Sequence, residues 1–388
     1  MPAVAGGLSR TITVMTRLLD HARADSARTI ETIERLVRLE SPSTDKPAVD
    51  RCGRALLDLL REAGAQVDAV PNATRGDHVR ARFGGEGAPV LLLGHFDTVW
   101  PVGTIEEMRL RTEGGRLHGP GTFDMKAGIA IGLAAVSALD ATNTPHPPVR
   151  MLWTTDEEIG SGTSRALIEE EARGARAVLV LEPALPGGGL KTARKGCGEF
   201  ELTVHGIAAH AGLDPGKGAS AIHELAIQIA AIERLQDLPR GISVNVGLVS
   251  GGSRPNVVAE QARAIVDVRA PTREAADVVE AALHALNPTR PGTRLTIRGG
   301  FDRPPMERTP AVARLFGMAA DVATALGSAV SEGSAGGGSD GNFTAALGVP
   351  TLDGLGAVGD GAHAAHEHID LASLPFRVAL VAGILARL

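Results

Sequence analysis

Short, continuous runs of apolar residues recur along the first half of the chain. Residues 90–93, 149–153 and 178–181 have the length and composition of strands that are buried on both faces. Apolar stretches of helical length, 125–139 and 164–171, lie between them. This alternation of strands and helices predicts an α/β domain in which helices cover both faces of a sheet.

Two helices are predicted near the N-terminus. Apolar residues recur every three or four positions in 30–37 and in 56–63, and Gly64 follows the second segment as a typical helix stop. The apolar patch 11–15 is flanked by arginines and is too short for the core of a signal peptide or for a membrane span. We therefore expect a cytoplasmic protein that does not act on membranes.

The pattern changes at Glu199, where apolar and polar residues begin to alternate. Phe200, Leu202 and Val204 are expected on one face of a strand. The predicted elements that follow are a helix (219–235), two strands (243–249 and 263–268), a helix (273–286) and a strand (294–298). The order βαββαβ is that of a split βαβ unit, so a smaller α+β domain is predicted to interrupt the first.

Helical spacing resumes beyond Thr309, at Val312, Leu315 and Ala319. The expected organisation is a larger domain in two parts, 1–194 and 309–388, with the inserted domain at 195–308. A chain of 388 residues with 44% hydrophobic content is long enough for two domains.

Charge and cysteine content narrow the class of protein. The net charge of −6 is mild and the basic residues do not cluster, so neither nucleic acid nor a membrane is expected as a partner, and small-molecule chemistry is favoured. Cys52 and Cys197 stand in unrelated segments without metal-binding spacing. We expect both to be reduced packing residues, although a disulfide between them is the alternative.

Polar motifs directly follow several of the apolar runs. Their imidazole and carboxylate side chains are, in chain order, His95, Asp97, Asp124, Glu157, Glu158, Glu182 and His363. Two imidazoles and several carboxylates form the ligand set that a pair of divalent ions needs. Carboxylates gathered at strand ends would repel one another without cations, and ligands in such folds bind at the carboxyl ends of the strands.

These motifs, in this order, resemble the M20 family of dinuclear zinc peptidases and amidohydrolases, and within it the glutamate carboxypeptidase branch. The resemblance runs from about Leu36 to the C-terminus. It rests on the segments 94–99, 119–126, 156–161, 181–183 and 210–212, and on His363 with Glu367 four residues later. It implies a zinc-peptidase-type catalytic domain, with a mixed sheet between helices, and an inserted lid and dimerisation domain.

The resemblance also implies the roles of the metal-binding residues. Asp124 bridges two Zn²⁺ ions, which Co²⁺ or Mn²⁺ can replace, while His95 and Glu182 complete one site and Glu158 and His363 the other. A single-metal site is the alternative. Glu157 is the expected general base, because it directly precedes a ligand and its side chain points elsewhere.

Asp97 is placed to accept the free N–H of His95 and so to fix the ligating tautomer; a turn or capping role is the alternative. His366 and His368 flank Glu367 and compete with His363 for the ligand role, but the Ala-His pattern favours His363. Six other histidines match no such motif and are expected to be surface or packing residues: His21, His78, His118, His146, His223 and His284.

Substrate contacts are implied for five further positions. The expected roles are an oxyanion donor that reaches the partner subunit's site for His210, and a grip on the substrate carboxylates for Asn256, Arg269 and Arg303. Gly338 lies in the glycine-rich segment 333–341, which is either a flexible linker or, as we expect, an ordered loop beside the substrate.

The expected activity is hydrolysis of the amide bond to a C-terminal amino acid, with glutamate or another acidic residue favoured. The substrate would be a small peptide or an N-acyl amino acid, and the protein a homodimer through the inserted domain. The first alternative is an N-acyl amino acid deacylase of the acetylornithine deacetylase or succinyl-diaminopimelate desuccinylase type. The second is a catalytically inactive metal-binding member, against which the complete ligand set and Glu157 argue.

Overall fold

The computed structural model describes residues 2–85 and 87–388, which form two compact units. The first unit comprises residues up to Thr192, Arg308–Ala335 and Ser339–Leu388. Ala193–Glu307 and the short segment Gly336–Gly338 make up the second. The second unit therefore interrupts the first in sequence, and its main segment runs from 193 to 307 where 195–308 was expected.

A six-stranded mixed sheet forms the centre of the first unit. Its order is β1 (Gln66–Val70), β2 (His78–Phe83), β6 (Val149–Thr154), β3 (Val90–His95), β7 (Ala177–Val180) and β14 (Thr351–Leu352). The four strands from β6 to β14 are parallel, whereas β2 runs antiparallel to both β1 and β6. The predicted α/β class and buried central strands are confirmed.

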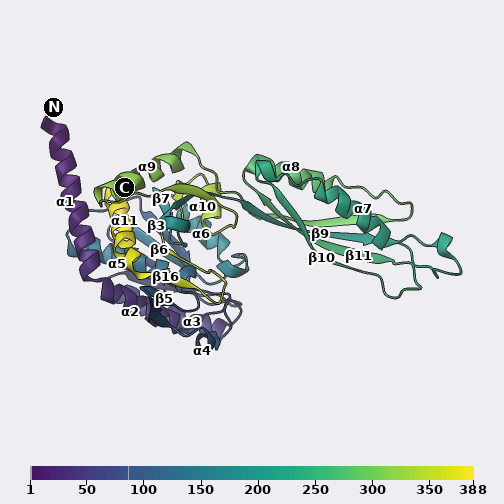
Figure 1. The fold of residues 1–388 in the computed structure, drawn as a ribbon, viewed down its shortest axis with the longest axis horizontal. Coiled ribbons are helices and arrows are strands. Elements are labelled where there is room, and N and C mark those ends of the chain that lie inside the picture. The colour runs from purple at the N-terminus through teal and green to yellow at the C-terminus, as the bar shows by residue number, and fades with distance from the viewer. Residues whose placement is uncertain (1, 86) are drawn as a thin grey trace. The chain divides into compact units, whose positions relative to one another are not determined.

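Helices cover both faces of this sheet (Figure 1). One face packs against α2 (Ser26–Val37), α3 (Lys46–Glu62), α5 (Ala127–Ala141) and α11 (Leu374–Arg387), in a core that includes Leu92 and Met151. The other face packs against α6 (Arg165–Ala172) and α10 (Gly341–Ala346). α9 (Pro310–Ala325) contributes to the first of these cores.

The chain opens with three helices rather than the two predicted. α1 (Pro2–Ala24) precedes α2 and packs on α11 and α5. Its Met15, Leu18 and Ala22 are buried at helical spacing. In the sequence, 11–15 stands out only as a short apolar patch, because polar residues outnumber the buried ones around it.

The stretch Thr122–Ala141, which contains α5, has the length and hydropathy of a membrane span. In this structure, however, 83% of its most apolar window is buried inside the fold. The apolar residues of α5 are not confined to one face. This pattern is typical of a helix that is buried on all sides in a protein core.

Substituting Gly128 with alanine is expected to lower the free energy of unfolding by about 1–3 kcal/mol. A Cβ at this position of α5 would lie 2.0 Å from the Leu181 carbonyl oxygen and 2.9 Å from Met125 Cε. The matched control is Gly317→Ala in α9, where a Cβ meets nothing within 4 Å and should stabilise the helix slightly. Equal unfolding midpoints in denaturant for both variants would contradict the packing argument.

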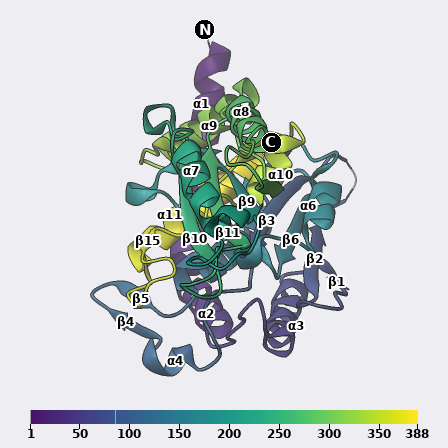
Figure 2. The same ribbon diagram turned by 90° about the vertical axis from the view of Figure 1, so that its right-hand side faces the viewer.

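The second unit is a four-stranded antiparallel sheet with two helices on one face (Figure 1, Figure 2). Its elements are β9 (Gly196–His205), α7 (Ala221–Glu233), β10 (Ser243–Gly251), β11 (Gln261–Ala270), α8 (Arg273–His284) and β12 (Arg294–Arg303), and its sheet order is β10-β11-β9-β12. Phe200, Leu202 and Val204 face the helices as predicted. β12 is longer than predicted because its pairing with β9 continues through 299–301 and, after an irregularity, includes Arg303.

Candidate metal centre

The carboxyl ends of three parallel strands bring site residues to one edge of the first unit's sheet. His95 is the last residue of β3, the helical turn Glu157–Ile159 follows β6, and Glu182 comes two residues after β7. His95 is buried and Glu182 is almost fully buried. His95 Nε2 lies 3.4 Å from Glu182 Oε1, so the ends of neighbouring strands meet as the sequence predicts.

Asp124 lies between the two histidines. It is in the turn Thr122–Lys126 that leads into α5, and its own backbone is not helical. Its Oδ1 is 3.3 Å from His95 Nε2 and its Oδ2 is 3.4 Å from His363 Nε2. His363 Nε2 also lies 3.0 Å from Glu158 Oε2, and the backbone of His363 is left-handed, with φ of 60°.

Asp97 connects His95 with the turn that carries both glutamates. His95 Nδ1 lies 3.0 Å from the Asp97 carbonyl oxygen and 3.4 Å from Oδ1, so the main chain of Asp97 shares the contact that was expected of its carboxylate. The carboxylate also accepts the backbone N–H groups of Glu157 and Glu158, both at 3.3 Å. Ser43 donates to the same carboxylate at 2.6 Å. Asp97 is therefore placed to orient both His95 and the glutamate turn.

The nearby carboxylates shift the pKa values of His95 and His363. Burial alone would lower the pKa of His95, but Asp124, Asp97 and Glu182 together raise it well above its ordinary value. Asp124 and Glu158 raise the pKa of His363 to about 10. Burial raises the pKa of Glu158, while His363 and His95 hold the pKa of Asp124 low despite its burial. The two imidazoles and the carboxylates around them therefore interact strongly through their charges.

The same residues fit divalent metal ions. Ligand atoms of His95, Asp124 and Glu158 all lie within 4.8 Å of one another, as do those of His95, Glu157 and Glu182. Asp124 Oδ1 is buried and accepts no hydrogen bond within the described part of the chain, although His95 Nε2 is near. Imidazole nitrogens mixed with carboxylate oxygens suit zinc, cobalt or manganese, and a cation would satisfy this oxygen.

His366 and His368 lie outside this group. His368, in β16 (His368–Asp370), stacks its ring 5.2 Å from that of His118 in the paired strand β5 (Arg116–His118). Its Nδ1 lies 2.9 Å from the His366 carbonyl oxygen. Of the three neighbouring histidines, the structure brings His363 to the carboxylates.

The expected substrate contacts lie in the second unit, at two ends of its sheet. Cys197 of β9 pairs with Arg269 of β11 on one side and with Arg303 of β12 on the other. A Cβ on Gly338 would lie 3.0 Å from Arg303 Cδ and 3.1 Å from Cys197 Sγ. Gly338 and the two arginines are therefore brought together at this end of the sheet.

Arg269 is already engaged within this cluster. Its Nε and Nη2 donate to the two carboxylate oxygens of Asp267 at 2.9 and 2.7 Å, and its Nη1 contacts Cys197 Sγ. Only the Nη1 side of the guanidinium faces away from Asp267. Arg303 is 6% exposed. Both cysteines carry free thiols, with Cys52 buried and Cys197 half-buried.

His210 and Asn256 lie at the other end of the sheet. The Ala211 N–H donates to the Asn256 carbonyl oxygen at 2.9 Å, and His210 is bridged to Val257, which continues the β9 and β11 pairing outward. His210 Nδ1 accepts the N–H groups of Gly212 and Leu213, both at 3.1 Å. The neutral ring therefore carries its proton on Nε2, which is a hydrogen-bond donor.

The segment 333–341 is ordered, and two of its residues have roles that the sequence did not indicate. Ser339 and Asp340 are buried. Ser339 donates to Asp353 Oδ2 at 2.7 Å, whereas Asp340 accepts from Thr154 and from Ser161 at 2.9 and 2.5 Å. Asp340 thus connects the end of β6 with Ser161, on the two sides of the turn that carries Glu157 and Glu158.

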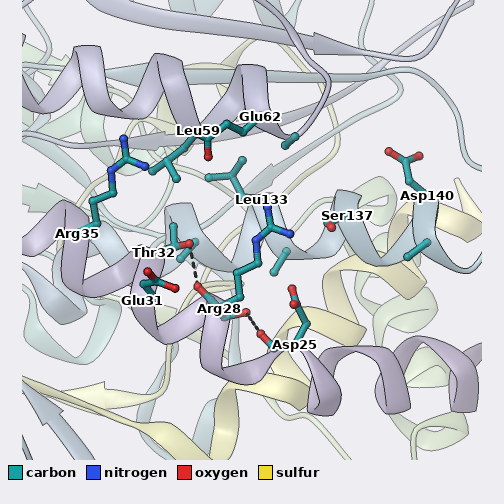
Figure 3. Close-up of a pocket in the computed structure, with 15 residues that line it drawn as sticks. Asp25, Arg28, Glu31, Thr32, Arg35, Leu59, Glu62, Leu133, Ser137 and Asp140 are labelled. Carbon is teal, nitrogen blue, oxygen red and sulfur yellow. Dashed lines mark hydrogen bonds between the residues drawn. The ribbon is translucent and has the colours of Figure 1, made fainter.

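A pocket of about 410 Å³ lies elsewhere on the first unit, between α2, α3 and α5 (Figure 3). Leu59, Leu133 and alanines form its floor, and charged residues such as Arg28 and Asp140 form its rim. None of the predicted site residues lines it. We therefore place the candidate active site at the strand ends rather than in this pocket.

The strand ends and the turns beside them gather two histidines and four carboxylates, a ligand set that suits a metal-dependent hydrolase. The model of peptidase family M20/M25/M40 matches residues 91–387, and the chain belongs to this family. The resemblance identified in the sequence is thereby confirmed, and the protein is a hydrolytic enzyme of the metallopeptidase and amidohydrolase type.

Individual relatives place the chain within the family. It is 28% identical to carboxypeptidase G2 of Pseudomonas sp. (strain RS-16) over 377 residues, which cover 95% of this chain and 91% of that protein. It is 32% identical to acetylornithine deacetylase of Myxococcus xanthus over 205 residues, 49% of this chain and 52% of that protein. The structure of the YXEP protein of Bacillus subtilis, a dinuclear metal-binding peptidase of family M20, matches 94% of this chain and 98% of its own with a TM-score of 0.67 at 17% identity.

Proposed function

We propose that the chain is a dinuclear zinc hydrolase that cleaves the amide bond to a C-terminal amino acid, with glutamate or another acidic residue as the leaving group. The position of Asp124 carries this proposal, because its two oxygens each face a different imidazole at 3.3 and 3.4 Å. That is the placement a bridging carboxylate requires. His95 with Glu182 would hold one ion, and His363 with Glu158 the other.

Bound divalent ions would lower the pKa of a shared water and polarise the scissile carbonyl. Glu157 lies with His95 and Glu182 in one group of ligand atoms. From there its carboxylate takes the water proton and returns it to the leaving amine. His210 supplies a neutral Nε2–H donor, which suits a carbonyl oxygen on which negative charge develops.

The acidic substrate is supported by the arginine cluster around Cys197. Arg303 and the Nη1 side of Arg269 lie on either side of one strand position, with Gly338 close by. Asp267 holds the Arg269 guanidinium in a fixed orientation. A substrate carboxylate would gain charge-assisted hydrogen bonds there without ordering a mobile side chain.

An N-acyl amino acid deacylase is the second candidate, and the similarity to acetylornithine deacetylase favours it. The two are separated by assaying the zinc-loaded protein against peptidyl, N-acyl and γ-linked glutamates beside N-acetylornithine. We expect the highest kcat/KM on a glutamate-terminated substrate. A preference for N-acetylornithine would assign the chain to the deacylases, and no turnover of any amide despite bound metal would favour the inactive alternative.

We further propose that the second unit mediates a homodimer. Among the described residues, β10 lies at the edge of its sheet. Its apolar side chains Leu248 and Val249 are 67% and 59% exposed. The neighbouring helix α7 also exposes Ile222 and Ile227. Apolar side chains along an unpaired strand edge favour pairing with another chain, here a second copy.

The distance along the sheet between the arginine cluster and His210 supports a substrate site to which two subunits contribute. The Cys197–Arg269 pair and the His205–Gln261 pair are eight residues apart on β9, roughly 27 Å for an antiparallel strand. His210 lies still further out. A substrate of two residues spans only about 7 Å, so the arginine cluster and His210 of one copy cannot both touch it. We therefore propose that His210 acts on the partner's substrate.

Mixing two inactive variants tests this arrangement. A heterodimer of His210→Ala and Glu157→Gln subunits has one intact and one doubly defective site if His210 acts across the dimer. We expect roughly half the wild-type activity per heterodimer. If His210 acts within its own chain, both sites stay defective, and activity does not recover although subunit exchange is proven by tagged copurification.

A further inference from the structure

Glu367 is a buried carboxylate with an unusual set of donors. Its residue is 1% exposed. Oε2 accepts the Gly121 N–H at 2.8 Å and the Trp100 indole N–H at 2.9 Å, while Oε1 accepts the N–H groups of Phe123 and Asp124 at 2.9 and 3.1 Å. All four donors are neutral. A buried carboxylate is tolerated only when hydrogen bonds of this kind replace its hydration.

The three backbone donors belong to the turn that presents Asp124. Gly121 has a left-handed φ of 72°, which favours glycine there, and the turn continues into the Asp124 backbone that Glu367 holds directly. Glu367 therefore fixes the main chain of the residue whose side chain lies between both histidines. The Asp124 carboxylate itself remains directed at His95 and His363.

The same side chain joins segments that are far apart in sequence. Glu367 follows His363 by four residues, and its N–H donates to the Ala364 carbonyl within that turn. Its carboxylate reaches 243 residues back to Asp124 and 267 residues back to Trp100. Trp100 lies five residues after His95. Glu367 is thus in contact with the three chain segments that carry His95, Asp124 and His363.

We propose that Glu367 is a positioning residue that sets the spacing of the metal ligands by holding the Gly121–Asp124 turn against the His363 turn. This rests on the proposed metal-dependent function. In Glu367→Gln one acceptor oxygen becomes an NH₂ group that faces backbone N–H donors, so the turn must shift. Outer contacts of metal ligands typically affect metal affinity by about 10- to 100-fold, and we expect a loss of zinc affinity in this range.

The test is a calorimetric titration of the metal-free full-length protein with Zn²⁺, together with thermal unfolding of the metal-free form. The matched control is Glu224→Gln in the second unit. Glu224 is also fully buried and accepts the backbone N–H groups of Thr289 and Arg290 at 3.0 and 2.8 Å. We expect Glu224→Gln to lower the unfolding temperature and leave the zinc dissociation constants unchanged.

A second variant, Trp100→Phe, removes a single donor and keeps the aromatic volume. We expect it to fold and to weaken zinc binding by a smaller factor than Glu367→Gln, with KM nearly unchanged and kcat reduced. If Glu367→Gln and Trp100→Phe bind two equivalents of zinc as tightly as the wild type, the positioning role is wrong. If the wild type itself binds no zinc in the titration, the proposed function fails, and the inference with it.

Discussion

Replacing Glu157 with glutamine is expected to lower kcat by about 10²- to 10⁴-fold while two equivalents of divalent metal stay bound. Glutamine keeps the volume of the side chain but cannot take a proton from water. The four other ligand carboxylates and imidazoles around Asp124 are untouched by the change. Elemental analysis and steady-state kinetics on the same preparation give both quantities.

The neighbouring variant Glu158→Gln is the control. Glu158 contacts His363 at 3.0 Å, so its change should weaken metal binding rather than proton transfer alone. Ligand atoms of Glu157 also lie within 4.8 Å of those of His95 and Glu182, which leaves a ligand role to be tested. If Glu157→Gln loses metal as Glu158→Gln does, Glu157 is a ligand and another group is the base.

Removing the carboxylate of Asp124 is expected to abolish binding of the metal pair and, with it, activity. In Asp124→Ala the two proposed ions lose the anion between them, and the site keeps only separate pairs of ligands. The metal content of the purified variant, after dialysis against stoichiometric zinc, should fall below one equivalent per chain.

Asp124→Asn provides a graded comparison, since the amide keeps one oxygen acceptor but no charge. It should retain at most one equivalent of zinc. Two tightly bound equivalents in Asp124→Ala would show that another carboxylate bridges the ions. Normal circular dichroism for both variants is needed to assign the metal loss to the site rather than to unfolding.

His95, Glu158 and Glu182 could be expected at the sheet edge because each follows an apolar run that is visible without the structure, whereas Asp124 and His363 were indicated only by the family resemblance. The apolar run 178–181 overlaps the buried strand β7, Ala177–Val180, so Glu182 was expected at the sheet edge. β2 was missed for the opposite reason: Arg80 and Arg82 interrupt its apolar pattern and are paired with Glu171 and Asp68. α1 was missed because its buried residues are sparse among polar ones.

Tertiary partners account for the rest of what the sequence could not indicate. Glu367 was visible as part of a motif, but its function depends on a hydrogen bond to a residue 243 positions away. Arg269 was expected to be available to substrate, yet Asp267 occupies two of its donor groups. Local spacing predicts which residues reach a sheet edge, and only the fold determines what they meet there.

The order of the ligands along the chain constrains how the centre is assembled during synthesis. His95, Asp124, Glu158 and Glu182 precede the second unit, whereas His363 and Glu367 follow it. A nascent chain that has just completed the second unit exposes four of these side chains at the strand ends but lacks the second imidazole and the brace for the Asp124 turn. In the proposed two-ion centre, stable loading would therefore wait for the last segment to dock, so the whole second unit would be made before the enzyme becomes active.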